Sequence, residues 1–107
     1  MKIKTIRFLG DSLERIKNFP ADAKQESGYQ LDQIQRGREP NDWKSFPDVG
    51  AGVREIRIKE TSGAFRVMYV TKFAESIYVL HAFQKKTQKT EKRDINLAKQ
   101  RYKEIQA

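Results

Sequence analysis

Cysteine is absent from this sequence of 107 residues, and histidine occurs only once. Without cysteine the chain forms neither disulfide bonds nor thiolate metal sites. The single histidine, His81, excludes the usual zinc sites, which need several histidine, cysteine or carboxylate ligands. No Gly-x-Ser-x-Gly sequence marks a serine nucleophile, and no glycine-rich phosphate loop marks a nucleotide site. The sequence therefore predicts no metal ion and no cofactor.

Long apolar runs are also missing. No run approaches the roughly 20 residues that a membrane-spanning helix needs, and residues 1–5 lack the apolar block of a secretory signal. Hydrophobic residues make up 37% of the chain and charged residues 34%, so much of the sequence is solvated surface. The length suits one domain, residues 1–107, around a single core. We expect a cytoplasmic protein that makes no membrane contact.

Positive charge is abundant, and it is unevenly distributed. The net charge is +8. Residues 1–53 hold nine Lys and Arg against eight Asp and Glu, whereas residues 54–107 hold thirteen against six. A small domain with one strongly basic half indicates an anionic partner, most often RNA or DNA. The alternative is a soluble surface with spare lysines.

The pattern of apolar residues in the first half predicts one strand, two helices and a long loop. The strand covers residues 2–9, and the helices cover 13–19 and 21–36, separated by Pro20. Two helices joined in this way form a helical hairpin that can cover one face of a sheet. Residues 37–52 form the loop, which is punctuated by proline and glycine. Within the loop, Trp43 and Phe46 suit an apolar plug better than a platform for base stacking.

From residue 53 the apolar residues alternate with polar ones, which predicts three strands over residues 53–60, 64–72 and 77–83. Short turns between them indicate an antiparallel meander. The third strand is the most apolar, so we place it in the centre of the sheet. A final helix begins at Glu91 with Thr90 as its N-cap. The fold class is α+β: a mainly antiparallel sheet of about four strands, two N-terminal helices on one face and a C-terminal helix.

Basic residues gather on this predicted sheet. Arg57 and Arg66 lie on adjacent strands between apolar neighbours, so both point away from the helix-covered face, and Glu55 shares the face of Arg57. Three lysines leave the end of the last strand: Lys85, Lys86 and Lys89. The pattern predicts a cationic concavity with one carboxylate in reach, and an ordinary solvated sheet face is the alternative. His81, inside an apolar strand, suits a hydrogen-bonded structural role.

Such a site fits the cleavage of RNA. RNA carries its own nucleophile, the 2′-hydroxyl, so the reaction needs no metal and no protein nucleophile. It needs cations that stabilise charge on the phosphorus and groups that move protons. Arginine presents a planar fork to phosphate oxygens, and a lysine among other cations can have its pKa lowered enough to act as a base.

Several short motifs resemble the phage-derived, HigB-like branch of the RelE toxin superfamily. They are Trp43-Lys44, Glu55-Ile56-Arg57, Phe65-Arg66-Val67, and Leu80-His81-Ala82-Phe83 followed by Lys85-Lys86-Thr87-Gln88-Lys89-Thr90. The resemblance implies a RelE-like fold and the toxin of a type II toxin–antitoxin pair. Such toxins are endoribonucleases that cleave mRNA, many of them on the ribosome. The implied partner is a cognate antitoxin, often a helix-turn-helix protein of the HigA type.

The resemblance also implies roles for individual residues. Arg66 matches the middle-strand arginine that acts on the scissile phosphate, Arg57 matches a basic position on the preceding strand, and Lys86 matches the basic residue after the last strand. The implied catalytic set is Arg66, Arg57, Lys86 and Glu55, and the implied RNA-binding set is Lys85, Lys89 and Lys44. Relatives often have a tyrosine or histidine shortly after the last strand, as an acid, base or stacking group, but residues 87–89 of this chain are Thr, Gln and Lys. The proton-transfer groups thus remain open, and a non-catalytic RNA- or ribosome-binding module is the alternative function.

Overall fold

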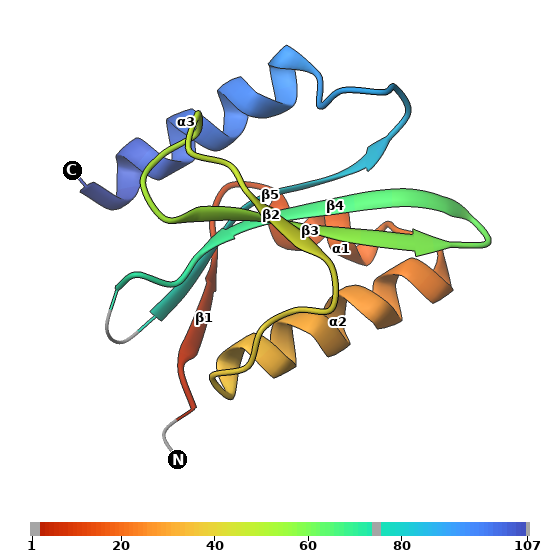
Figure 1. Ribbon diagram of the computed structural model, residues 1–107, viewed down its shortest axis with the longest axis horizontal. Coiled ribbons are helices and arrows are strands. Elements are labelled where there is room, and N and C mark those ends of the chain that lie inside the picture. The colour runs from red at the N-terminus through yellow and green to blue at the C-terminus, as the bar shows by residue number, and fades with distance from the viewer. Residues whose placement is uncertain (1–2, 74–75, 107) are drawn as a thin grey trace.

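A computed structural model describes residues 3–73 and 76–106, which form one five-stranded sheet with helices on both of its faces (Figure 1). Along the chain the elements are β1 (Thr5–Phe8), α1 (Ser12–Lys17), α2 (Ala21–Gln35), β2 (Trp43–Ser45), β3 (Val53–Glu60), β4 (Gly63–Val70), β5 (Ser76–Lys85) and α3 (Lys92–Gln106). Across the sheet the strand order is β1-β5-β4-β3-β2. No helix in this part of the chain combines the length and apolar character that crossing a membrane requires.

The sheet is mixed, and in this it differs from the predicted sheet of about four mainly antiparallel strands. β1 pairs parallel to β5, while the other three pairings are antiparallel. The strand that the sequence did not predict, β2, falls inside the predicted loop of residues 37–52. Three residues are too few to show an alternating pattern, and β2 exists because its backbone pairs with the edge of β3. The predicted α+β class and the 53–70 hairpin are confirmed.

The helices α1 and α2 cover one face of the sheet, as predicted. Ile16 of α1 and the buried stripe of α2 (Ala23, Leu31 and Ile34) pack on apolar side chains of the strands. Those strand residues are the ones at alternate positions that the sequence pattern assigned to the covered face: Ile56, Ile58, Phe65, Val67 and Tyr69. Leu13, which also lies at helical spacing in α1, is exposed instead.

The helix α3 covers part of the opposite face (Figure 1). Ala98 and Tyr102 on its inner side are buried against Met68, Val70 and Leu80 of the sheet. This face therefore has a core of its own and is not the open surface that the sequence suggested. The most apolar strand, β5, lies inside the sheet as predicted, but β4 occupies the middle of the five strands.

The predicted apolar plug is half correct. Phe46 is buried in the core beneath α3. Trp43 is only half-buried, and the guanidinium of Arg54 lies 4.0 Å above the centre of its ring. Because Trp43 belongs to the edge strand β2, it packs on the rim of the sheet and not within it.

Candidate nucleic-acid interface

The strand register brings the predicted site residues together on the face that α3 covers in part. Arg57 of β3 is paired with Arg66 of β4, which is in turn paired with Phe83 of β5. On the other side of β3, Glu55 is paired with Lys44 of β2. Side chains on directly paired residues lie about 5 Å apart at their Cβ atoms. Three neighbouring strands therefore present Lys44, Glu55, Arg57 and Arg66 as one cluster.

Glu55 is the buried centre of this cluster. Its side chain has no exposed surface, and its Oε1 atom lies 3.7 Å from Nε of Arg66, whose side chain is 7% exposed. The hydroxyl of Thr90 donates a hydrogen bond of 3.1 Å to Oε2 of Glu55. The segment after β5 therefore folds back over the sheet and reaches the carboxylate. Thr90, predicted as a helix cap, is a partner of Glu55.

Three buried polar atoms of the cluster have no hydrogen-bond partner among the described residues. They are Oε1 of Glu55, Nε of Arg57 and Nε of Arg66. The Nη1 atom of Arg66 donates to the carbonyl oxygen of Phe65. Buried polar groups in folded proteins are nearly always paired, so unpaired ones at one place indicate a functional position. The buried donors here are guanidinium groups, which match phosphate oxygens.

The fold holds these cations together at an electrostatic cost. Burial lowers the pKa of the Arg66 guanidinium, the charge of Glu55 opposes that shift, and the charge of Arg57 adds to it. Burial likewise lowers the pKa of Lys85, and the neighbouring charge of Arg66 lowers it further. An arginine remains protonated at neutral pH despite such a shift. A bound anion would relieve the mutual repulsion, which favours phosphate binding at this cluster.

Arg66 reaches solvent through a shallow cavity of about 540 Å³. The residues that line it are Ala64, Arg66, Lys85, Lys86, Thr87 and Gln88. Lys85 is half-buried at the end of β5, whereas Lys86 is exposed. The predicted residues Arg66, Lys85 and Lys86 therefore share one cavity.

Two of the predicted RNA-binding lysines lie apart from this cavity. The Nζ atom of Lys44 lies 5.2 Å from the ring centre of Phe46, at the far side of Glu55. Lys89 is exposed and does not line this cavity. The expectation that Arg66 and Glu55 stand on an open face is wrong, because both are buried and Thr90, in the segment that leads to α3, contacts Glu55.

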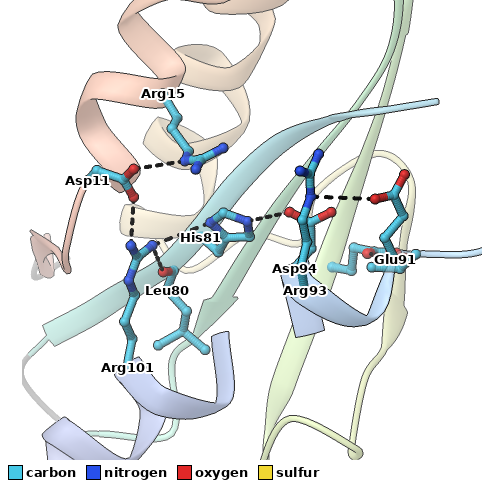
Figure 2. Close-up of polar contacts among 10 residues, drawn as sticks. Asp11, Arg15, Leu80, His81, Glu91, Arg93, Asp94 and Arg101 are labelled. Atoms are coloured by element: carbon cyan, nitrogen blue, oxygen red, sulfur yellow. Dashed lines mark hydrogen bonds and ion pairs between the residues drawn. The ribbon is translucent and has the colours of Figure 1, made fainter. Parts of the chain in front are cut away.

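His81 is buried and hydrogen-bonded, in agreement with the structural role expected of it (Figure 2). Its Nε2 atom lies 2.7 Å from Oδ1 of Asp94, and a donor of Arg101 lies 3.3 Å from Nδ1. Because the guanidinium of Arg101 can only donate, Nδ1 of His81 accepts its hydrogen bond and carries no proton. The proton of the ring is therefore on Nε2, which donates a hydrogen bond to Asp94. Burial lowers the pKa of His81 although Asp94 opposes the shift. The imidazole is neutral and ties β5 to α3.

The same network extends to α1, which the sequence did not indicate. Arg101 donates to the carbonyl oxygen of Leu80 at 3.0 Å and to Asp11 at 2.6 Å. Asp11 also accepts from Arg15 one helical turn later, at 2.9 Å (Figure 2). Only the four-residue spacing of Asp11 and Arg15 is visible in the sequence, because Arg101 is 90 residues from Asp11. The network fixes both helices against the strand that ends in the basic segment.

The cluster offers cations and one carboxylate, and the chemistry open to it follows from these groups. The described residues contain no group of three or more His, Cys, Asp or Glu side chains that could hold a metal ion. The guanidinium groups can bind and polarise a phosphate, and Glu55 can accept a proton. Lys85, with its lowered pKa, is a better proton donor than an ordinary lysine.

The chain matches the model of a known protein family. The family model described as "Phage derived protein Gp49-like (DUF891)" matches residues 14–103. This family belongs to the RelE/toxin-like superfamily. The matched range contains every predicted site residue, from Lys44 to Lys89. No curated protein matches the chain.

Proposed function

We propose that this chain, which belongs to the phage-derived Gp49-like family of the RelE/toxin-like superfamily, is the toxin of a type II toxin–antitoxin pair. It acts as a metal-independent endoribonuclease of the HigB-like type that cleaves mRNA on the ribosome and so stops translation. One observation carries the proposal: Arg57, Arg66 and Lys85 converge around a buried carboxylate, and the Nε atoms of both arginines are buried without a hydrogen-bond partner among the described residues.

The proposed reaction is an in-line transfer within the RNA. The 2′-oxygen attacks the adjacent phosphorus, the bond from phosphorus to the 5′-oxygen breaks, and the products are a 2′,3′-cyclic phosphate and a 5′-hydroxyl. Arg66 and Arg57 stabilise the charge that grows on the phosphoryl oxygens. Their donors are held in place by the sheet before the substrate arrives.

Two proton transfers complete the reaction. Glu55 accepts the proton of the 2′-hydroxyl, and Lys85 donates a proton to the leaving 5′-oxygen. The lowered pKa of Lys85 supports this assignment, and its position near Arg66 makes it a stronger candidate than the more exposed Lys86, to which we assign phosphate binding. Because Glu55 has no exposed surface, substrate access requires Thr90 to release its hydrogen bond to the carboxylate.

The proposed partner is a cognate antitoxin, a helix-turn-helix protein of the HigA type. The basic half of the chain carries most of the net charge of +8, so the antitoxin is expected to cover it with acidic residues. Covering the cavity beside Arg66 would block access to mRNA. The alternative function, a non-catalytic RNA- or ribosome-binding module, uses the same charges but needs no proton acceptor.

The substitution Arg66→Lys separates an enzyme from a binding module. Lysine keeps a positive charge beside Glu55 but lacks the two-pronged donor geometry of arginine. Loss of one preorganised donor of this kind costs about a hundred- to a thousand-fold in rate. We expect the variant to bind ribosomes as the wild type does and to lose growth arrest.

The assay pairs growth after induction with mapping of mRNA 5′ ends in the same cells. Arg36→Lys, on the exposed end of α2 and away from the cluster, is the control and should arrest growth normally. Wild-type growth arrest without new mRNA ends would remove the catalytic proposal and favour the binding module.

A further inference from the structure

A second cavity lies beside the same basic segment. Its volume is about 210 Å³, and it shares Lys85, Lys86 and Thr87 with the cavity at Arg66. Its other walls come from the end of β5, from Arg15 of α1, and from residues within 89–94, at and before the start of α3. A water molecule occupies about 30 Å³ in the liquid, so a phosphodiester group fits in this space. The two cavities therefore share one short stretch of chain.

The walls of the second cavity carry more positive than negative charge. Its cations are Arg15, Lys85, Lys86, Lys89 and Arg93, and its carboxylates are Glu91 and Asp94. Both carboxylates already have partners, because Asp94 accepts from His81 at 2.7 Å and Glu91 lies 3.4 Å from Arg93 (Figure 2). The three lysines make no ion pair with the described residues. The cavity thus keeps a surplus of about three positive charges, which suits an anion.

Arg15 is the residue that the fold adds to this site. It comes from α1, some 70 residues before the lysines, yet it lines the same cavity. The chain of contacts from Arg15 through Asp11 and Arg101 to β5 holds α1 in this position. Its ion pair with Asp11 is half-exposed, so the guanidinium keeps donors for another acceptor.

We propose that this cavity is a second phosphate subsite, which binds the RNA phosphate next to the scissile one through Arg15, Lys86 and Lys89. The subsite rests on the proposed function, because its ligand is the same RNA strand. Lys85 and Lys86 lie between the two cavities, so one RNA strand can cross this segment with one phosphate on each side. Lys89, which stands apart from the Arg66 cavity, acquires a role in this arrangement.

The test compares Arg15→Ala with Arg36→Ala. Both substitutions remove an arginine whose Nε atom pairs with an aspartate four residues earlier, at 2.9 and 3.0 Å, and both arginines are similarly exposed. Only Arg15 lines the cavity. The probe is a short single-stranded 2′-O-methyl RNA, which lacks the attacking hydroxyl and cannot be cleaved. Its affinity is measured across a series of salt concentrations.

Loss of one phosphate contact should lower the slope of log affinity against log salt by about 0.7. At low salt the affinity of Arg15→Ala should fall by up to about fivefold, the scale of one exposed ion pair, while Arg36→Ala should match the wild type. Equal slopes for Arg15→Ala, Arg36→Ala and the wild type would overturn the subsite. Failure of the wild type to bind the probe would overturn it as well. Neither result decides the cleavage of mRNA, which the mapping of mRNA ends tests separately.

Discussion

Removal of the Arg66 guanidinium should destabilise the fold through the charge that it leaves behind. Glu55 is fully buried, and Arg66 is its ion-pair partner at 3.7 Å. Removing one partner of a buried ion pair generally costs about 3–5 kcal/mol, because the other charge stays buried without compensation. Here Thr90 still donates to Glu55, and Arg57 and Lys85 lie nearby. We therefore expect Arg66→Met to cost about 3 kcal/mol, the lower end of that range.

This loss is large enough to measure but leaves the protein folded. Domains of this size typically unfold with a free energy of about 5–15 kcal/mol, so most molecules of the variant remain native at room temperature. At about 4 °C for each kcal/mol, the melting temperature should fall by at least about 12 °C. Arg57→Met is the matched control, because it also removes a cation from this face of the sheet. The side chain of Arg57 is 37% exposed, so its loss leaves no buried charge on its own ion-pair partner. Its ion pair with Asp42, at 3.9 Å, should contribute less than about 1 kcal/mol.

A double-mutant cycle tests the cause of the loss. In Glu55→Gln with Arg66→Met both charges are gone, so the double variant should recover most of the stability that Arg66→Met loses. Unfolding in urea, followed by circular dichroism, provides the four free energies. If the two single losses simply add, the ion pair is not what links Glu55 to Arg66. If Arg66→Met were as stable as the wild type, the charge of Glu55 would not be buried as the structure has it.

Three further outcomes are expected. Burial lowers the pKa of His81 in the folded state, so as the pH falls the unfolded chain is protonated before the folded one. The free energy of unfolding should therefore decrease below about pH 6.5. In His81→Gln, the urea concentration at the unfolding midpoint should decrease less over the same pH range. Gly10→Ala should lower the melting temperature more than Gly37→Ala does. Both glycines have positive φ, but only at Gly10 would the added Cβ overlap a side chain, that of Arg101. Equal decreases in melting temperature would mean that backbone strain accounts for the whole effect. Association with an acidic antitoxin should slow as ionic strength rises in stopped-flow measurements, and an unchanged rate would argue against electrostatic steering.

The alternation of residues in the 53–70 region made the central part of the site predictable. A period of two assigns Ile56, Ile58, Phe65 and Val67 to one face, and the short turn at residues 61–62 sets the register. The side-by-side position of Arg57 and Arg66 follows from these two facts and is confirmed. A local pattern is enough to predict this arrangement, because β3 and β4 follow each other in the chain and pair across a short turn.

Other parts of the site depend on contacts between distant segments. The parallel pairing of β1 with β5 joins residues about 70 positions apart, and the three residues of β2 become a strand only beside β3. The hydrogen bond to the buried Glu55 comes from Thr90, which is 35 residues away, and one wall of the second cavity comes from Arg15 of α1. The sequence pattern assigned Thr90 to a helix N-cap and gave Arg15 only a four-residue spacing from Asp11, so neither residue was marked as part of the site.

The sequence by itself therefore determined the α+β class, the two helices on one face, the central hairpin, and the basic character of the segment after β5. Each of these follows from the spacing of apolar and charged residues within a short stretch. Only the tertiary structure decided that α3 covers part of the second face, that Glu55 and Arg66 are buried with Thr90 bonded to the carboxylate, and that α1 lines a cavity with the lysines. Burial depends on which distant segments pack together, and a charged residue at an alternating position looks the same in the sequence whether a helix covers it or water does.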